Sequence, residues 1–526
     1  MKRFATPVLI GIFCVFVLQA CEPLDESSNE PEHVGEGIPW YEGSVEEAFK
    51  LAKAENKPIF LYWGAVWCPP CNQLKATVFK QRSFIEKTRL FVPVYLDGDT
   101  DNAQKYGEKF AVSGYPTLIV FDPAGEEITR IPGGLNLDRY VEVLDLSLQN
   151  FRSASQIFAD LKKGNTLEER DFRLMSLYSW SQDKGKLLSD DAAELLYRMY
   201  SACPSEMRME KSRLFTAWWT FRLQSLTDEN KVAEPLSRAE LVEAGSNIEK
   251  ILNDEALVEN NLFFILYDRG SSISALTARD TIERERLLSL WKSALELIEN
   301  NKNLSLMENL FPLQAEIYLD NIESADEFFV DADFQKEILQ KVKLAREKID
   351  NKYDQSAVVY RAWNILKLAN LNEDAESMLK EELARTDSPY YFMVDLADAA
   401  QKAGREDEAV SWLKRAYEES KEGSTRFQWG IIYLEGMVEM QANRHEDVAA
   451  LSGELATYLE KLDDAFYNRN SKRVKRMSTA LNSWYEQEKN EDVWLRIKSD
   501  IDALCKSFDA GSENFSRCQV FLSNLG

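Results

Sequence analysis

Two cysteines, Cys68 and Cys71, lie two residues apart in the stretch WCPPC, with two prolines between them. Thiols at this spacing can ligate a metal, close a permanent disulfide, or exchange electrons by opening and closing a disulfide. A structural zinc site takes about four ligands. The chain has no second CxxC motif, and its only two histidines, His33 and His445, lie far from the pair in sequence. The composition therefore argues against zinc and predicts no metal site, whereas both disulfide chemistries remain open.

The elements on either side of the pair indicate which sulfur is reactive. Residues 58–63, PIFLYW, form a continuous apolar run typical of a strand buried on both faces, and residues 72–79 have helical spacing. A helix that begins at the pair directs backbone N–H groups and its positive dipole end at Cys68, which favours the thiolate there. Pro69 suits the first turn because it lacks an N–H that would have no partner. We expect Cys68 to be the nucleophile and Cys71 to be the resolving thiol.

The surrounding pattern predicts a small α/β domain over residues 39–150. The expected elements are a helix over 44–57 with Ser44 as N-cap, a strand over 91–97, a helix over 101–110, two strands within 116–131 joined by a turn at 123–125, and a helix over 136–150. Together with the strand and helix at the cysteines, this order fits one central sheet covered by helices.

Two stretches, KPIFLYWGAVWCPPC at 57–71 and GYPTLIVFDPAGE at 114–126, together resemble the thioredoxin superfamily. The likeness is to the branch that includes the C-terminal domain of bacterial thiol:disulfide interchange proteins, and it covers about a fifth of the chain. It implies that Pro116 is cis and faces the sulfur pair, that the backbone at Tyr115 pairs with an extended client, and that Trp67 shields the sulfurs. Core packing is the alternative for Trp67 and Tyr115.

The sequence departs from the family pattern at two positions. Many thioredoxins carry a buried acid six residues before the first cysteine, where this chain has Tyr62, and the usual lysine after the second cysteine is replaced by Asn72. These changes put the rate and the redox poise in doubt rather than the type of reaction. No histidine stands between the cysteines, which favours a reductase or isomerase over a strong oxidant.

The N-terminal segment has the pattern of an export signal. Lys2 and Arg3 precede an apolar run over 8–18, and the following Leu-Gln-Ala-Cys resembles a bacterial lipobox in which Cys21 is lipidated. We expect residues 1–20 to be a lipoprotein signal peptide; an ordinary cleaved signal and an uncleaved anchor are the alternatives. Residues 21–38 are acidic and rich in Pro, Gly and Ser, as in a flexible tether. The expected location is the bacterial cell envelope, facing the periplasm, on either membrane.

Residues 151–526 show many amphipathic helical segments and few alternating ones, which predicts a large all-α solenoid. Ala375 and Ala409 are 34 residues apart, and so are Leu379 and Leu413, which is the tetratricopeptide (TPR) period. The clearest TPR-like repeats cover about 356–422. An irregular helical domain is the alternative.

Three further cysteines lie in this helical region. Cys505 and Cys518 flank a turn that contains glycine, and in an oxidising compartment they could form a structural disulfide. Cys203 would then have no partner, and we expect it to be buried.

Other patterns carry weaker signals. Residues 97–108, DGDTDNAQKYGE, approach a calcium loop but lack its glycine, so a strand end and helix start explain them better. The basic residues within 468–477 could contact anionic lipid or an acidic client, but a solvated helix face is favoured. The net charge of −25 argues against nucleic acid as a partner.

These patterns predict an envelope thiol–disulfide oxidoreductase that acts by dithiol exchange and needs no cofactor. Its expected partners are protein thiol or disulfide clients, a redox protein that supplies or accepts electrons, and the membrane through the lipid anchor. In the alternative, the protein is a redox-inert lipoprotein scaffold whose helical region binds partners while the α/β domain only docks.

Overall fold

The computed structural model describes residues 37–133, 137–183, 185–188, 192–227, 234–324 and 328–525. The predicted signal peptide, the lipidation site Cys21 and nearly all of the predicted tether lie outside these residues. Everything described belongs to one compact unit that begins at Gly35. None of the described helices is both long and apolar enough to cross a membrane.

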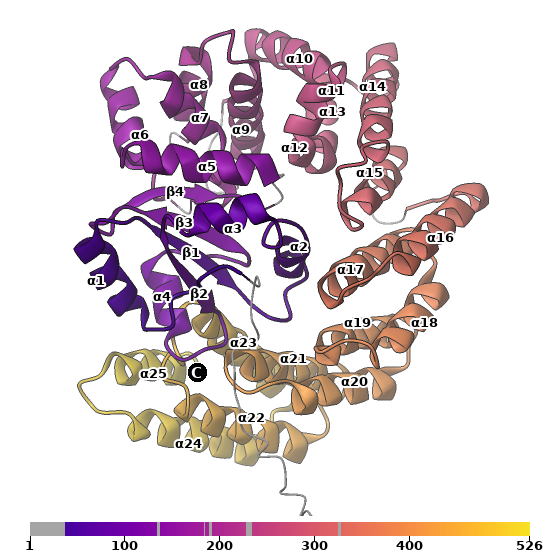
Figure 1. Cartoon of the computed structure of the whole chain (residues 1–526). Coiled ribbons are helices and arrows are strands. Elements are labelled where there is room, and N and C mark those ends of the chain that lie inside the picture. Colours follow the sequence, from indigo (N-terminus) through magenta and orange to yellow (C-terminus); the bar gives the residue numbers. More distant parts are fainter. Residues whose placement is uncertain are drawn as a thin grey trace, which may run out of the picture. The chain divides into compact units, whose positions relative to one another are not determined.

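A four-stranded sheet forms the centre of the N-terminal domain (Figure 1). Its order is β2-β1-β3-β4, with β1 parallel to β2 and antiparallel to β3, and β3 antiparallel to β4. Every residue of β1 is buried, which accounts for its uninterrupted apolar sequence. The strands are β1 (Ile59–Gly64), β2 (Val92–Asp97), β3 (Thr117–Phe121) and β4 (Glu127–Ile131).

Five helices accompany this sheet. Ser44 caps the first with a capping box, as the sequence indicates, because its hydroxyl accepts from the N–H of Glu47 while the Glu47 carboxylate accepts from the N–H of Ser44. The sequence predicted one helix between β1 and β2, but there are two, because Gln81 takes an extended conformation and starts a second. The helices are α1 (Val45–Glu55), α2 (Pro69–Thr77), α3 (Arg82–Thr88), α4 (Ala103–Lys109) and α5 (Leu137–Gln149).

The rest of the described chain is helical, so the predicted fold class, a small α/β domain followed by a large all-α region, is confirmed. The α-helices are α6 (Ala154–Lys163), α7 (Glu169–Ser176), α8 (Ala192–Ala202), α9 (Arg208–Leu226), α10 (Arg238–Leu252), α11 (Glu255–Asn260), α12 (Leu262–Tyr267), α13 (Arg269–Leu276), α14 (Ile282–Glu299), α15 (Phe311–Asp320), α16 (Ala332–Glu347), α17 (Lys352–Leu368), α18 (Asn372–Glu382), α19 (Pro389–Lys402), α20 (Glu406–Glu419), α21 (Ser424–Met440), α22 (His445–Glu460), α23 (Asn468–Glu488), α24 (Glu491–Ser507) and α25 (Glu513–Ser523). Two short 3-10 helices, η1 (Trp180–Gln182) and η2 (Glu308–Leu310), lie among them.

The residues that gave the repeat signal lie between packed helices. Ala375 and Leu379 on α18, and Ala409 and Leu413 on α20, are all buried. Helix α19 packs against both α18 and α20, and α20 packs against α21. Alanine allows two helix backbones to approach closely at such positions, and leucine fills the adjoining space. Assignment of these helix pairs to the tetratricopeptide class stays a prediction.

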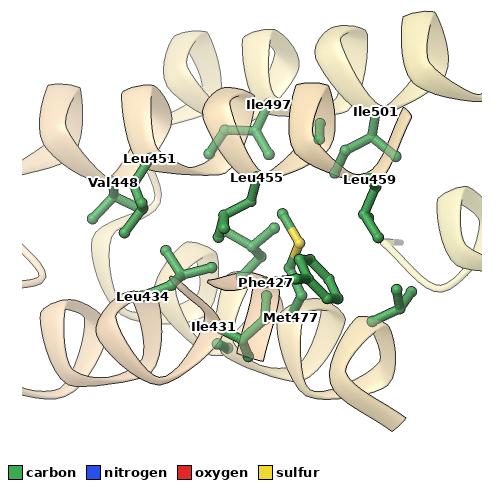
Figure 2. Packing of buried hydrophobic residues seen from close by; sticks show 14 of the residues in the cluster. Phe427, Ile431, Leu434, Val448, Leu451, Leu455, Leu459, Met477, Ile497 and Ile501 are labelled. Atoms are coloured by element: carbon green, nitrogen blue, oxygen red, sulfur yellow. The ribbon is translucent and has the colours of Figure 1, made fainter. Parts of the chain in front are cut away.

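The largest apolar cluster around the C-terminal helices joins α21, α22, α23 and α24 (Figure 2). Its centre contains Phe427 and Leu434 from α21, Leu455 from α22, Met477 from α23 and Ile497 from α24. These residues are almost completely removed from water. Truncation of one such leucine or methionine to alanine typically costs about 2–5 kcal/mol of stability. The C-terminal helices are therefore anchored firmly enough to present side chains to other parts of the molecule.

The three cysteines of the helical region differ in state. Cys505 on α24 and Cys518 on α25 form a disulfide with their Cα atoms 5.3 Å apart. Cys203 is free and buried. Burial raises the pKa of the Cys203 thiol to about 12, so it stays protonated and unreactive at neutral pH.

Removal of the Cys505–Cys518 disulfide is expected to loosen α25 from α24. The cross-link spans 13 residues, and closing a loop of that length lowers the entropy of the unfolded chain by an amount worth about 3 kcal/mol. A Cys505→Ala, Cys518→Ala double variant should unfold at lower denaturant concentration than the oxidised parent. The parent treated with reductant is the control and should approach the variant; a parent that reductant leaves unchanged would contradict the cross-link.

Candidate redox site

The redox pair lies where β1 gives way to α2. β1 ends at Gly64 and α2 begins at Pro69, so Cys68 is the N-cap residue of α2. Cys68 and Cys71 are joined by a disulfide, with their Cα atoms 5.2 Å apart. The Cys71 N–H donates a hydrogen bond of 3.2 Å to Sγ of Cys68. The sulfur of Cys68 therefore receives the N–H and dipole of the helix start, which stabilises negative charge on it when the disulfide is open.

The side chains predicted to flank the pair are adjacent to it. Trp67 and Tyr115 both pack against the small cluster that contains Cys68 and Cys71. Their rings meet edge to face, with centroids 5.7 Å apart. The Tyr115–Pro116 peptide bond is cis, and Pro116 lies directly before β3. The fold thus assembles the two cysteines, Trp67 and Tyr115 around one point, with the cis Pro116 next to Tyr115 in the chain.

Both sulfur-bearing residues are strongly shielded. Cys68 is 3% exposed and Cys71 is fully buried. Of the two, Cys68 is the one with any exposed surface, which fits the assignment of Cys68 as the attacking residue.

Tyr62 occupies the position where related domains carry a buried acid, and it does not replace that acid. Its ring is fully buried and stacks on Tyr95 at 5.4 Å. Burial raises the pKa of Tyr62 well above its ordinary value, so its hydroxyl stays protonated. It therefore cannot accept a proton from Cys71.

Asp97, the last residue of β2, is a buried carboxyl near the end of β1. Its Cα is paired with that of Gly64, four residues before Cys68. It accepts hydrogen bonds from the Tyr95 hydroxyl and from the N–H of Asp99, each 2.9 Å long. Burial, and then the charge of Asp99, raise the pKa of Asp97 to about 6. This carboxyl can therefore change its protonation state close to neutral pH.

Two helices from the C-terminal half of the chain contact the site. Tyr391 on α19 stacks on the indole of Trp67, with ring centroids 6.0 Å apart. The Arg469 guanidinium on α23 lies 5.7 Å from the Trp67 ring centre and 5.6 Å from that of Tyr115. Asp99 joins these groups, because its carboxylate accepts from Trp67 Nε1 at 2.8 Å and from Arg469 Nη2 at 2.5 Å.

The loop between β2 and α4, together with α4, forms the rest of this contact. The N–H of Gln104 donates to Asp464 at 2.7 Å, and Glu108 pairs with Arg517 on α25 at 2.7 Å. Gly423, before α21, approaches so closely that a Cβ on it would lie 2.6 Å from the carbonyl oxygen of Asp99, and its φ of +94° also favours glycine.

These contacts bear on two sequence predictions. Residues 97–108 do hold the predicted strand end and helix start, because β2 ends at Asp97 and α4 begins at Ala103; Asp99 and Glu108 also pair with arginines of the helical region. The basic segment 468–477 is not a wholly solvated face, because Arg469 is turned into the contact with Asp99 and is 11% exposed. Among the residues described, no cluster of His, Cys, Asp and Glu could hold a metal ion.

The part of the chain that carries the cysteine pair also matches known proteins in sequence. A family described as "Thioredoxin-like domain" matches residues 45–147. Residues 45–147 form a thioredoxin-like domain. Nucleoredoxin of Bos taurus is 26% identical over 189 residues, which cover 30% of this chain and 42% of that protein.

Bacterial relatives match over a shorter stretch of the chain. Thiol:disulfide interchange protein DsbD of Actinobacillus pleuropneumoniae serotype 5b (strain L20) is 28% identical over 100 residues, or 18% of this chain and 17% of that protein. The DsbD of Yersinia pestis (strain Pestoides F) is 30% identical over 98 residues, covering 18% and 16%. The chain thus spans less than half the length of the curated relatives it matches.

Sequence reasoning missed the part of the site that comes from the helical region. Tyr391, Asp99 and Arg469 were not singled out as site residues. Asp99 and Arg469 are 370 residues apart in sequence, yet they form a hydrogen bond beside the cysteines. One signal was present, since an acidic loop that follows a strand and a basic cluster in an acidic chain are complementary in charge.

Helix α19 carries a second buried carboxyl, Asp395, one turn after Tyr391. Burial raises the pKa of Asp395 to about 7, and its Oδ2 has no hydrogen-bond partner among the described residues. The folded state therefore holds this proton more tightly than the unfolded state, whose aspartate has a pKa of about 3.9. This difference costs stability progressively as the pH rises from about 4 through 7.

The variant Asp395→Asn should remove that pH-dependent cost. We expect it to gain about 2 kcal/mol over the parent at pH 8 and less at pH 5, as measured by denaturant unfolding. Asp398→Asn on the same helix is a matched control whose effect on stability should have the opposite sign. Burial raises the pKa of Asp398, but Lys367 and Lys402 outweigh it and hold that pKa below its ordinary value. A gain for Asp395→Asn that does not grow with pH would refute this interpretation.

Proposed function

We propose that this protein is a thiol–disulfide oxidoreductase of the bacterial cell envelope that acts through Cys68 and Cys71. The observation that carries the proposal is a closed cysteine pair that caps the first helix after the central strand of a thioredoxin-like domain. Trp67 and the cis Tyr115–Pro116 segment beside it are the proposed client-binding elements.

In the reductive direction the chemistry is dithiol exchange. The Cys68 thiolate attacks one sulfur of a client disulfide, which forms a mixed disulfide and releases one client thiolate. Cys71, once deprotonated, attacks Cys68 Sγ, closes the Cys68–Cys71 disulfide and releases the second client thiolate. Two electrons pass to the client, whose thiolates take up two protons. A protein dithiol must then reopen the pair, and the same steps in reverse would oxidise a client.

The sequence between the cysteines supports a reductase or isomerase role, because two prolines rather than a histidine stand there. The N-terminus of α2 stabilises the Cys68 thiolate, as the nucleophile requires. Asp97 offers a buried carboxyl that can gain or lose a proton near neutral pH, where Tyr62 cannot. We propose Cys68 as the nucleophile and Cys71 as the resolving thiol.

The proposed domain plan has four parts: a signal peptide over 1–20, a tether over 21–38, the thioredoxin-like domain over 39–150, and a TPR-like helical region over 151–526. The helical region would bind clients or the redox partner. Its helices α19 and α23 already contact the residues that flank the cysteines, so it would also restrict which clients can approach Cys68.

The proposed location is the periplasmic side of the envelope, with the protein held by a lipid on Cys21. The support is the lipobox-like sequence and the likeness of the thioredoxin-like domain to bacterial DsbD proteins.

The catalytic proposal is tested by insulin reduction with the full chain and dithiothreitol as electron source. Cys68→Ser should lose essentially all activity above the uncatalysed rate, since the attacking sulfur is gone. Cys71→Ser should instead accumulate mixed disulfides, because no second thiol can release the client. Cys203→Ser, which changes a buried and protonated thiol, is the matched control and should leave the rate unchanged. Activity that survives Cys68→Ser would refute the proposal.

A second candidate function is a redox-inert scaffold in which the thioredoxin-like domain only docks. The strong shielding of both cysteines and the stacking of Tyr391 on Trp67 favour it. The two functions separate in cells: a Cys68→Ser, Cys71→Ser double variant that restores the phenotype of a deletion strain would support the scaffold.

The lipid anchor is tested separately. Cys21→Ser removes the acyl acceptor, so the protein should move from the membrane fraction to the soluble periplasmic fraction when cells are fractionated. Labelling with radioactive palmitate should disappear with the same change. A variant that stays in the membrane fraction would indicate an uncleaved apolar anchor instead.

A further inference from the structure

The buried guanidinium of Arg469 is a positive charge inserted beside the redox pair. It comes from the first turn of α23 and faces both aromatic rings that pack on the cysteines, at 5.7 Å from Trp67 and 5.6 Å from Tyr115. Contacts of this kind place the cation against the negative faces of the rings. The charge therefore lies against the two rings that pack on the sulfur-bearing residues.

The bonds of Arg469 hold it in place without using all of its donors. Nη2 donates to Asp99 Oδ1 and to the carbonyl of Gly98, and the backbone N–H of Arg469 donates to Gln104. Nε and Nη1 are buried and have no hydrogen-bond partner among the described residues. A guanidinium that has been removed from water and is only partly hydrogen-bonded exerts a strong local field.

Asp99 is the counter-ion and lies on the same side of the pair. Its other oxygen accepts from Nε1 of Trp67, the residue immediately before Cys68. The pair Asp99–Arg469 thus places one negative and one positive charge near Cys68, and their fields at the sulfur have opposite signs. Removal of either partner leaves the other uncompensated in a poorly hydrated place.

We propose that Arg469 is a positioning residue of the redox site, supplied by the helical region: its charge, balanced by Asp99, favours the thiolate of Cys68 in the reduced protein. The inference rests on the proposed function, because it assigns a role in the same reaction. The redox site is then composite, with the cysteines on the thioredoxin-like domain and part of the electrostatic field on a helix some 370 residues later in the chain.

Other charged and titratable groups contribute to the field at Cys68, and they stay constant in the comparison below. They come from the elements packed near the pair: Lys75 on α2, Asp97 on β2, Tyr115 before β3, Tyr353 on α17, Tyr391 on α19 and Asp464 before α23.

A purely structural role for Arg469 is the competing explanation, and the sign of the effect separates the two. If the Asp99–Arg469 bond only docks the helical region, loss of either side chain breaks the same contact and changes Cys68 in the same direction. If the charges act on the sulfur, Arg469→Gln leaves the carboxylate in excess and disfavours the thiolate. Asp99→Asn leaves the guanidinium in excess and favours the thiolate.

The experiment measures alkylation of Cys68 by iodoacetamide as a function of pH. The full chain carries Cys71→Ser so that Cys68 stays reduced and unpaired, and mass spectrometry follows the peptide that contains Cys68. The midpoint of the rate–pH curve should move up by about half a pH unit or more in Arg469→Gln and down by a similar amount in Asp99→Asn. The double variant should lie between them.

The matched control is Arg517→Gln, which removes an arginine–carboxylate contact between α25 and α4 without touching the rings beside the cysteines. Its midpoint should equal that of the parent. Midpoints that move in the same direction in the two single variants, or that do not move, would overturn the inference. If Arg469→Gln fails to fold by circular dichroism, an Asp99→Asn midpoint that does not lie below that of the control would still overturn the inference.

Failure of the inference about Arg469 is distinguishable from failure of the proposed function. Equal midpoints in a protein that still reduces insulin through Cys68 would reject the role of Arg469 alone. Insulin reduction that persists in Cys68→Ser would reject the oxidoreductase itself, whatever the midpoints are.

Discussion

The hydrogen bond from the Cys71 N–H to Sγ of Cys68 is the interaction on which the site depends. One sulfur atom serves both as the cap of α2 and as the proposed nucleophile. Its position follows from β1, which is buried at all six residues and therefore fixes where the chain can leave the sheet. Pro69 then starts the helix without an N–H to satisfy.

Much of the thioredoxin-like domain could be predicted because its signals are local. Ser44 with Glu47 marks a helix start, the apolar run at 59–64 marks a buried strand, and the turn at 123–125 separates two strands. The cysteine pair could be found for the same reason. The short helix α3 was missed, since it begins at Gln81, whose side chain makes no capping bond. In the helical region, buried alanines and leucines at a 34-residue spacing gave the helix pairs but not the class of repeat.

The contribution of the helical region to the site could not be predicted, because its signals are not local. An arginine in an amphipathic helix looks solvent-exposed until a distant partner is known, and the partner of Arg469 is 370 residues away. Tyr391 likewise looks like an ordinary core residue of α19. Burying the Asp99–Arg469 pair removes two charges from water, so its net contribution to stability is small.

The order of the chain gives this contact a consequence for assembly. The thioredoxin-like domain leaves the ribosome first, and domains generally fold as units in that order. Gly423, which approaches the Asp99 carbonyl, and Arg517, which pairs with Glu108, follow only after some 300 further residues. During synthesis the nascent domain therefore presents its sulfur pair without the cover of α19 and α23. In a newly made molecule, other thiols can therefore reach Cys68 and Cys71 before the C-terminal helices have been synthesised. The same two sulfurs are then more accessible during synthesis than in the completed fold.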